Sequence, residues 1–256
     1  MTTLFSLEGR KALVTGGGQG LGFAMASGLV EAGASVALVD IDGDKARRAA
    51  KSLAGSGGRV VGVTGDVTSA TDAKRAVEEV AHALGGIDLL FNNAGISIMA
   101  PAEEVSIKDF IRTYEIDVFG LFTMSQTAFG ALRESGRGVI VNIASMAGIN
   151  VLVPQEHTAY NSAKAAVIMI TKSLAVEWAP FGIRVNAIAP GYMLTPPLEE
   201  FRKEDPDRWK FWMSRVPLGR VGVPDDLLGA AVFLSSDASS YMTGATLVID
   251  GGYTCL

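Results

Sequence analysis

The sequence predicts a single α/β domain built on a parallel β-sheet, and three observations support this prediction. Short apolar runs rich in β-branched residues alternate with longer stretches of helical periodicity. Glycine or polar residues follow one apolar run after another, and no proline-rich linker, composition break or internal repeat divides the 256 residues. Strands that alternate with helices form right-handed βαβ units, which place the strands parallel and side by side.

The first half of the chain contains four expected strands: 11–15, Ser35–Asp40, Arg59–Val63 and Ile87–Phe91. Helical patterns extend from the glycine-rich loop after the first strand to about Ala32, and over residues 69–84.

The second half begins with a long amphipathic stretch over about 103–133. The strands expected after it are Val139–Ile143, Ile183–Ala189 and Thr246–Ile249, and the helices are about Thr158–Trp178 and about Asp225–Leu234. A charged and aromatic segment, residues 193–215, interrupts this alternation.

Composition excludes several classes of protein. Apolar residues make up 48% of the chain, which excludes a disordered protein, and a formal charge of −5 argues against nucleic acid as a partner. One cysteine and two histidines make a metal site unexpected. The chain has no apolar run of membrane-spanning length and no recognisable signal sequence, so we expect a cytoplasmic protein without a membrane partner.

A glycine-rich loop follows the first strand. Gly16, Gly20 and Gly22 are spaced T-G-x-x-x-G-x-G and precede a helical pattern, an arrangement in which helix N-terminal N–H groups face a phosphate. A glycine-rich turn alone would look the same. Asp40 favours a dinucleotide site, because an acidic residue at the end of the second strand suits a ribose hydroxyl.

The same carboxylate bears on the choice of cofactor. A 2′-phosphate beside Asp40 would be repelled, and neither Gln19 nor Ile41 supplies a cation to offset the repulsion. The sequence therefore predicts NAD rather than NADP.

Tyr160 and Lys164 are spaced i, i+4 and lie on one face of the expected helix. An ammonium about 4 Å from the phenol, at an effective dielectric of about 20, favours the phenolate by about 4 kcal/mol. Tyr160 then becomes a usable general acid and base, and the hydroxyl of Ser145 is placed to hold a substrate oxygen. Any Tyr-x-x-x-Lys on a surface helix would look similar, so the functional interpretation of this pair depends on the rest of the sequence.

The context is that the candidate residues follow strands. Gly16, Asp40, Asp66, Asn92, Ser145 and Pro190 all do so. The carboxyl ends of parallel strands meet at one edge of a sheet, where such folds bind ligands.

The combination of TGGGQGLG, NNAG, Ser145, YNSAK and Pro190-Gly191-x-x-x-Thr195, in this order, resembles the short-chain dehydrogenase/reductase family over essentially the whole chain. The resemblance implies a doubly wound, Rossmann-type fold with a seven-stranded sheet. It also implies that Tyr160 is the general acid/base, that Lys164 assists it and that Ser145 orients the reacting group. The cofactor-binding residues are expected to be Gly16, Gly20, Leu21, Gly22, Asp40, Ile41, Asp66, Val67, Asn92, Asn93, Ala94, Gly95, Tyr160, Lys164, Pro190, Gly191, Met193 and Thr195.

One position departs from the family pattern. The family usually has asparagine where Asp117 stands, and that asparagine helps to hold a water in a proton relay with the lysine. We include Asp117 among the expected catalytic residues, although it adds a charge near Lys164.

The loop between Ser145 and Tyr160 has both ends at expected catalytic residues and should line the substrate pocket. Asn150, Gln155 and His157 are candidate partners of a hydroxylated substrate, although each taken singly also fits a solvated loop. Residues 193–215 correspond to the family's substrate lid. Trp209 and Trp212 either cover the pocket or pack their helix onto the domain.

The pair Pro154-Gln155 before YNSAKAAV and the ending IDGGYT resemble the family's polyol dehydrogenases and ketose reductases. The leading interpretation is therefore an NAD-dependent enzyme that interconverts a secondary alcohol and a ketone on a polyol or sugar. A 3-ketoacyl or steroid ketone reductase and a non-catalytic dinucleotide-binding protein remain as alternatives. The expected 158–178 helix is apolar around most of its circumference, so we expect it to be buried against the sheet and against another subunit. The resemblance implies a homotetramer or homodimer built from this helix and the one spanning 103–133.

Overall fold

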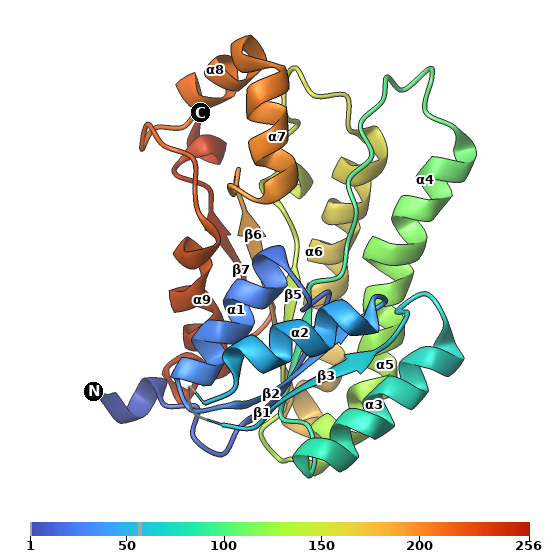
Figure 1. Cartoon of the computed structure of the whole chain (residues 1–256), viewed down its shortest axis with the longest axis vertical. Coiled ribbons are helices and arrows are strands. Elements are labelled where there is room, and N and C mark those ends of the chain that lie inside the picture. The colour runs from blue at the N-terminus through green and yellow to red at the C-terminus, as the bar shows by residue number, and fades with distance from the viewer. Residues whose placement is uncertain (1, 56–57) are drawn as a thin grey trace.

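Seven parallel strands form the centre of the structure, in the order β3-β2-β1-β4-β5-β6-β7 (Figure 1). The computed structural model describes residues 2–55 and 58–256. Its strands are β1 Lys11–Thr15, β2 Ser35–Asp40, β3 Val60–Thr64, β4 Leu89–Asn92, β5 Val139–Ile143, β6 Arg184–Pro190 and β7 Thr246–Ile249. The predicted doubly wound, Rossmann-type α/β fold with a single domain is confirmed. From β1 the chain first adds strands on one side, β2 and β3, and then on the other side, beginning with β4. Such folds form a ligand-binding crevice at this switch point, between β1 and β4.

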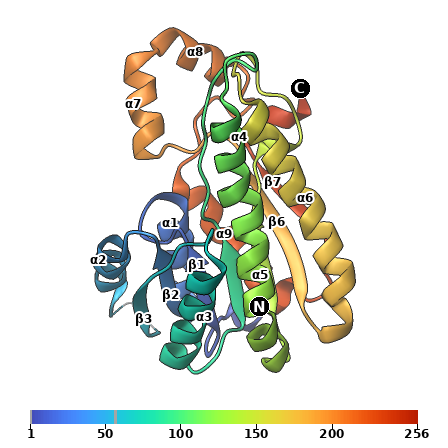
Figure 2. The same ribbon diagram turned by 90° about the vertical axis from the view of Figure 1, so that its right-hand side faces the viewer.

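Helices cover both faces of this sheet (Figure 2). One face carries α1 (Gly20–Glu31), α2 (Gly43–Leu53) and α9 (Leu228–Ser235), and the other carries α3 (Ala70–Leu84), α5 (Leu121–Glu134) and α6 (Thr158–Trp178). Neighbouring residues of one strand belong to opposite faces, because side chains alternate along a strand. In β1, Val14 packs with the α1 side and Leu13 with the α3 side.

Helix α2 was not predicted from the sequence. Its apolar face is made mainly of small residues, with Ala46, Ala49 and Ala50 buried, so the helical periodicity is weak there. Asp42 marks its beginning, because its carboxylate accepts a hydrogen bond from the N–H of Lys45 at 3.0 Å.

The stretch predicted as one amphipathic unit is three elements in sequence: α4 (Ile107–Tyr114), a π-helical turn (Glu115–Gly120) and α5. The segment 193–215 contains two short helices, α7 (Pro196–Glu204) and α8 (Pro206–Ser214), which lie above the carboxyl ends of the strands (Figure 1). The helix predicted over 225–234 begins as a 3-10 turn, Pro224–Leu227, before α9. The other 3-10 segments are Thr2–Phe5, Met146–Gly148, Ala179–Phe181, Asp237–Ser239 and Tyr253–Cys255.

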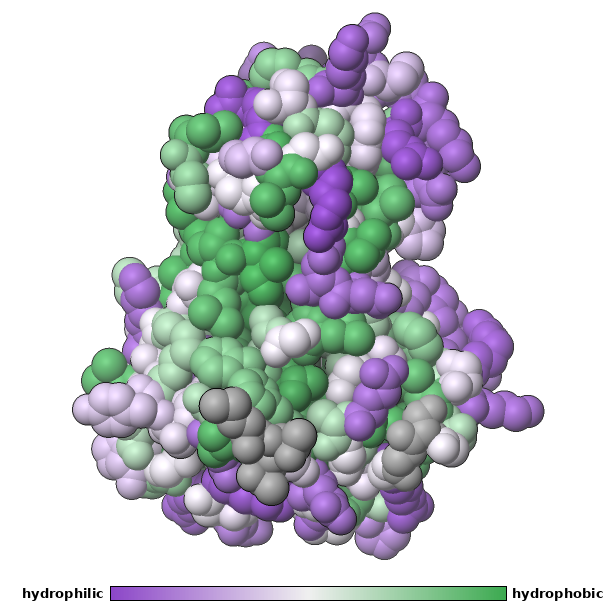
Figure 3. Space-filling view, turned by 90° about the vertical axis from the view of Figure 1, so that its left-hand side faces the viewer, coloured by the Kyte–Doolittle hydropathy of each residue, from purple (hydrophilic) through white to green (hydrophobic). Residues whose placement is uncertain are grey.

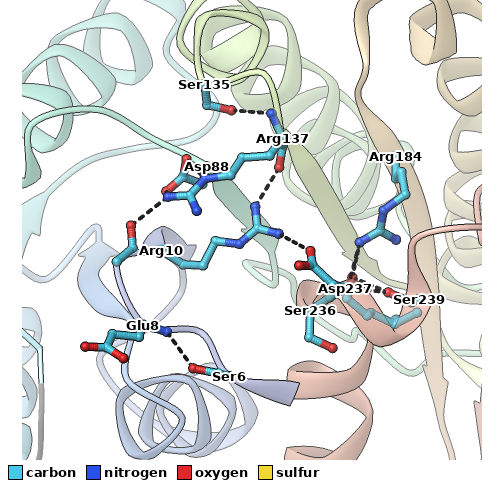
Figure 4. Close-up of polar contacts among 12 residues, drawn as sticks. Ser6, Glu8, Arg10, Asp88, Ser135, Arg137, Arg184, Ser236, Asp237 and Ser239 are labelled. Atoms are coloured by element: carbon cyan, nitrogen blue, oxygen red, sulfur yellow. Dashed lines mark hydrogen bonds and ion pairs between the residues drawn. The ribbon is translucent and has the colours of Figure 1, made fainter. Parts of the chain in front are cut away.

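A network of charged residues, of which Arg10 and Asp88 are buried, ties the amino ends of the strands together (Figure 4). Arg10, just before β1, donates to the carbonyl of Arg137 at 2.8 Å and pairs with Asp237 at 3.2 Å. Arg137 pairs with the buried Asp88 at 3.1 Å, and Asp88 also accepts the N–H of Lys11 at 2.8 Å. This network lies at the edge of the sheet opposite to the one where the candidate residues gather.

Candidate active site

A cavity of about 1010 Å³ opens at the carboxyl ends of the strands. Most of the predicted site residues line it, and they come from the segments that follow β1, β2, β3, β4, β5 and β6 together with the π-helical turn and α6. They are Gly16, Gly20, Leu21, Asp40, Ile41, Asp66, Val67, Asn93, Ala94, Gly95, Asp117, Ser145, Tyr160, Lys164, Pro190, Gly191 and Thr195. One edge of the sheet thus brings together residues that are up to 179 positions apart in the chain.

The glycine-rich loop forms one wall of this cavity at the beginning of α1. Gln19 is the N-terminal cap residue of α1, and its side chain makes no capping hydrogen bond. The first N–H groups of α1 therefore have no side-chain partner and remain available to an anion. A β-carbon on Gly20 would meet nothing within 4 Å, whereas one on Gly22 would collide with the amide nitrogen of Asn93. Gly20 leaves the wall open, and Gly22 permits close packing behind it.

Asp40 is held in place by backbone amides. One carboxylate oxygen accepts the N–H of Gly18 at 3.1 Å and the other accepts the N–H of Asp42 at 3.1 Å. No ion pair to Asp40 occurs among the residues that the structure describes. Its negative charge therefore faces the cavity without a compensating cation.

The segment after β4 forms the floor between the glycine loop and the π-helical turn. The side-chain amide of Asn93 donates to the carbonyls of Thr15 and Gly16 at 2.9 and 3.1 Å. In return, the N–H groups of Asn93 and Ala94 donate to the hydroxyl of Thr15 at 3.0 and 3.1 Å. These four hydrogen bonds hold the carboxyl ends of β1 and β4 in one fixed relation.

Lys164 occupies the centre of a buried polar cluster. Its Nζ donates to the carbonyl of Ile143 at 3.0 Å, pairs with a carboxylate oxygen of Asp117 at 3.0 Å, and lies 5.5 Å from the centre of the Tyr160 ring. Burial alone would lower the pKa of Lys164, but the charges of Asp117 and Tyr160 outweigh burial and raise it. Lys164 is therefore an ammonium at neutral pH, which fits its predicted action on Tyr160.

Asp117 is almost completely buried, at 1% exposure, and lies in the π-helical turn. Its second carboxylate oxygen accepts the N–H of Ile96 at 2.8 Å. The turn inserts extra backbone between α4 and α5, a feature that often occurs at functional sites. Asp117 thus connects the segment after β4 to the lysine of α6.

Ser145 follows β5 and lines the same cavity. The N–H of Ala147 donates to its hydroxyl oxygen at 3.1 Å. The hydroxyl proton has no acceptor among the described residues, so Ser145 can donate it to a ligand.

The remaining predicted residues do not line the cavity. Gly22 and Asn92 lie behind it, and Asn92 instead donates to Ser125 and Asn142 at 2.8 and 2.9 Å in the core. Met193 is buried, and the amide of Gln155 hydrogen-bonds the hydroxyl of Tyr192. Asn150 and His157 are also outside the cavity lining, although His157 packs next to Tyr160 with 5.7 Å between the ring centres.

The cavity also has lining residues that the sequence analysis missed: Ser97, Arg112 and Glu200. Ser97 is the second residue after Gly95 in the NNAG segment, so continuing that segment into the cavity would have found it. No sequence signal identifies Arg112 and Glu200, since both lie among other charged residues on helices.

The segment 193–215 packs onto the domain through aromatic rings. Trp212 is buried and stacks between Tyr192, at 4.8 Å between ring centres, and Phe201, at 4.4 Å. Trp209 is only half-buried. Trp212 therefore packs its helix onto the domain, and α7 brings Thr195 and Glu200 to the cavity.

Comparisons with known proteins agree with this geometry. A family model described as "Enoyl-(Acyl carrier protein) reductase" matches residues 16–254. D-threitol dehydrogenase from Mycolicibacterium smegmatis is 41% identical over 250 residues, which cover 98% of this chain and 95% of that protein.

Two crystal structures extend the comparison. NAD+-bound xylitol dehydrogenase is 35% identical with a TM-score of 0.90, and the match covers 96% of this chain and 99% of that one. A gluconate 5-dehydrogenase from Burkholderia cenocepacia, in complex with NADP and tartrate, is 35% identical with a TM-score of 0.91, covering 100% and 99%.

Fold and cavity together define a nicotinamide-dinucleotide oxidoreductase that acts on CH–OH groups. More specifically, the chain belongs to the short-chain dehydrogenase/reductase family. Among the described residues, no helix is long and apolar enough to cross a membrane, and no group of three or more His, Cys, Asp or Glu is arranged to hold a metal ion.

Proposed function

We propose that this protein is an NAD-dependent dehydrogenase that interconverts a secondary alcohol and a ketone on a polyol or sugar. The observation that carries the proposal is the placement of Ser145, Tyr160 and Lys164 in the same cavity as the glycine loop and Asp40. A reacting carbon at Tyr160 would then lie within reach of a dinucleotide bound along the strand ends.

The residues present fit such a dinucleotide. The glycine loop and the uncapped first turn of α1 suit the diphosphate, and Asp40 suits the ribose hydroxyls of the adenosine half. We assign the rest of the cradle to residues from the later strand ends: Asp66, Val67, Asn93, Ala94, Gly95, Pro190, Gly191 and Thr195. When bound, the nicotinamide supplies the hydride acceptor or donor.

Asp40 supports NAD over NADP. Its carboxylate is fixed by two amides and lacks a cationic partner among the described residues, so a 2′-phosphate would meet an uncompensated charge. Solved relatives with NAD+ and with NADP both exist, so this position, rather than the family, carries the assignment.

The chain's own residues divide the proton chemistry among them. Tyr160 takes the hydroxyl proton during oxidation and returns it during reduction. Lys164, held as an ammonium by Asp117, favours the phenolate by its charge, and its third N–H would be available to a ribose hydroxyl of the cofactor. Ser145 accepts the N–H of Ala147 and donates its hydroxyl proton, which no described residue accepts, to the substrate oxygen.

The substrate class rests on the relatives and on the polar residues near Tyr160. Relatives named for threitol and xylitol cover nearly the whole chain. Of the three predicted substrate contacts, we retain His157 beside Tyr160. None of the three lines the cavity, but His157 packs next to Tyr160, whereas Gln155 hydrogen-bonds Tyr192, so His157 is the contact that we keep.

The test is steady-state oxidation of a panel of polyols, sugar acids and simple secondary alcohols with NAD and NADP in parallel. Turnover of a polyol with NAD supports the proposal. Preference for NADP would overturn the assignment based on Asp40. Turnover only of 3-hydroxyacyl thioesters or hydroxysteroids would replace the substrate class, and NADH binding without turnover on any substrate would indicate a non-catalytic protein.

A second copy of the chain is the proposed partner. The outer face of α6 exposes Met169 and Val176, and the neighbouring α5 side exposes Phe119 and Phe122. Figure 3 shows a further apolar area on the side of the molecule that faces left in Figure 1. We propose a homodimer or homotetramer that covers the α5–α6 face. A monomer mass from sedimentation at micromolar concentration would refute it.

A further inference from the structure

The proposed proton chemistry does not use Ser97 and His157, two polar side chains that approach each other at the cavity; His157 packs next to Tyr160, just outside the cavity lining. Ser97 belongs to the segment after β4 and lines the cavity that contains Ser145 and Tyr160. Its hydroxyl oxygen lies 3.5 Å from Nε2 of His157. The two residues come from segments that are 60 positions apart.

The backbone holds these two segments together. The N–H of Ala100, three residues after Ser97, donates to the carbonyl of Glu156 at 2.9 Å. His157 follows immediately and is the N-terminal cap residue of α6, three residues before Tyr160. The position of the imidazole relative to Tyr160 is therefore set by the beginning of a 21-residue helix.

The imidazole has no structural role that accounts for its polar atoms. His157 makes no side-chain hydrogen bond to cap α6, although it occupies the cap position. Its Nδ1 is buried and has no hydrogen-bond partner among the described residues. A buried polar atom without a partner is unfavourable, so the contacts of the described residues give no structural reason for a histidine at this position.

The ring is also in the form that suits a hydroxyl group. Burial lowers the pKa of His157, so the ring is neutral at physiological pH. A neutral imidazole offers one N–H donor and one nitrogen acceptor, and the hydroxyl of Ser97 can donate and accept. A substrate hydroxyl needs both kinds of partner.

We propose that Ser97 and His157 bind the hydroxyl group on the carbon next to the reacting one, and so make the enzyme selective for vicinal diols over isolated secondary alcohols. This inference rests on the proposed function and adds the recognition element. Ser145 and Tyr160 hold the reacting oxygen, and the Ser97–His157 pair holds its neighbour. A polyol satisfies both pairs, whereas a steroid or a simple alcohol leaves the second pair without a partner.

The test compares 2,3-butanediol, as each stereoisomer, with 2-butanol, because the two compounds differ by one hydroxyl on the same carbon chain. We expect the wild-type enzyme with NAD to prefer at least one diol stereoisomer by about tenfold or more in kcat/KM. Ser97→Ala and His157→Phe should each lower kcat/KM for that diol by about fivefold, the effect of one neutral hydrogen bond, and leave 2-butanol within about twofold. His157→Gln, which keeps a donor and an acceptor, should recover part of the preference.

His82→Gln and Ser52→Ala are matched controls on α3 and α2, away from the cavity, and should change neither substrate. Equal losses on diol and 2-butanol in both variants would overturn the inference, since they would show that the pair only supports Tyr160. Wild-type turnover of both compounds at equal efficiency would also overturn it. Absence of wild-type turnover on any alcohol would instead refute the proposed function itself. If His157→Phe does not fold, Ser97→Ala alone decides between these outcomes.

Discussion

Replacing Asp117 with asparagine removes one charge from the buried pair with Lys164 and changes little else. Asparagine keeps the size of the side chain and an oxygen that can accept the N–H of Ile96. In the structure, the Asp117 carboxylate lies 3.0 Å from Nζ of Lys164, and Nζ lies 5.5 Å from the centre of the Tyr160 ring. The carboxylate oxygen therefore lies no more than about 8.5 Å from the centre of the Tyr160 ring.

The sign and size of the effect follow from Coulomb's law. A unit charge about 8.5 Å away changes an ionisation free energy by about 2 kcal/mol at an effective dielectric of about 20. This energy corresponds to about 1.4 pH units. The Asp117 charge opposes the lysine, so Asp117→Asn makes the phenolate easier to form. We expect the midpoint of the pH profile for alcohol oxidation to move about one unit lower.

The maximum rate should change less than the profile. Asparagine is the residue that the family usually has here, and the contact with Ile96 is retained. We expect turnover at the optimum to stay within about tenfold of the wild-type value, or about 1.4 kcal/mol of barrier.

Stability should fall in the same variant. The pKa of Lys164 is raised in the folded protein, so the pair stabilises the fold below the unfolded lysine value of about 10.4, and this contribution is lost as the pH rises through the raised pKa. Removing one partner leaves a buried ammonium, at a cost of roughly 3–5 kcal/mol. The difference in unfolding free energy between the wild-type protein and Asp117→Asn should be largest at neutral pH and should decrease at strongly alkaline pH.

The assay is kcat/KM for oxidation of one alcohol from about pH 6 to about pH 10.5 in both enzymes, together with denaturant unfolding at the same pH values. An unchanged midpoint would refute the electrostatic reasoning. A loss of several orders of magnitude at every pH would show that the carboxylate itself takes part in proton transfer. Asp88→Asn, at the opposite edge of the sheet, is the control for loss of a buried carboxylate.

Three further predictions address the cofactor, the proton and the fold. Tyr160→Phe should keep NADH binding and lose at least about 10² in turnover, and unchanged turnover would remove Tyr160 from the mechanism. Asp40→Ser should lower kcat/KM for NAD by about 10- to 100-fold, since a charged hydrogen bond contributes roughly 1.5–3 kcal/mol. The ratio of kcat/KM for NAD to kcat/KM for NADP should therefore decrease. Asp88→Asn should lower the free energy of unfolding in urea by about 2 kcal/mol, because Arg137 and Lys11 lose a buried acceptor, and leave kcat/KM within about twofold. A larger loss of activity would show that the Asp88 contacts at the amino edge of the sheet affect the active site at the carboxyl edge.

Much of the fold was predictable because its signals are local. Each strand is a short apolar run between turn residues, and strands that alternate with helices leave few arrangements other than a parallel sheet. The glycine loop, Asp40 and Ser145 were predictable for a related reason. Parallel strands bring their carboxyl ends together whatever the length of the helices between them, so position after a strand was enough to collect these residues.

The parts that were missed depend on contacts rather than on local pattern. The π-helical turn around Asp117 keeps the helical periodicity on both sides, so the sequence gives no sign of the extra residue. Gln155 was expected to face the substrate, but packing against Tyr192 turned it inward. The approach of Ser97 to His157 arises from the pairing of Ala100 with Glu156, two loop residues without any sequence signature.

Buried charge by itself does not mark the active site of this protein, because it occurs at both edges of the sheet. At the amino edge, Arg10 donates to the carbonyl of Arg137, and Asp88 accepts the N–H of Lys11 and pairs with Arg137 (Figure 4). Neither Arg10 nor Asp88 lines the 1010 Å³ cavity. At the carboxyl edge, Lys164 and Asp117 are paired as tightly, yet they border the 1010 Å³ cavity together with Tyr160. Buried charges whose polar atoms are all hydrogen-bonded or ion-paired, and which border no cavity, serve to hold the fold together. The Lys164–Asp117 pair differs in that it lines the cavity together with the phenol of Tyr160, which is the arrangement that the proposed proton transfer requires.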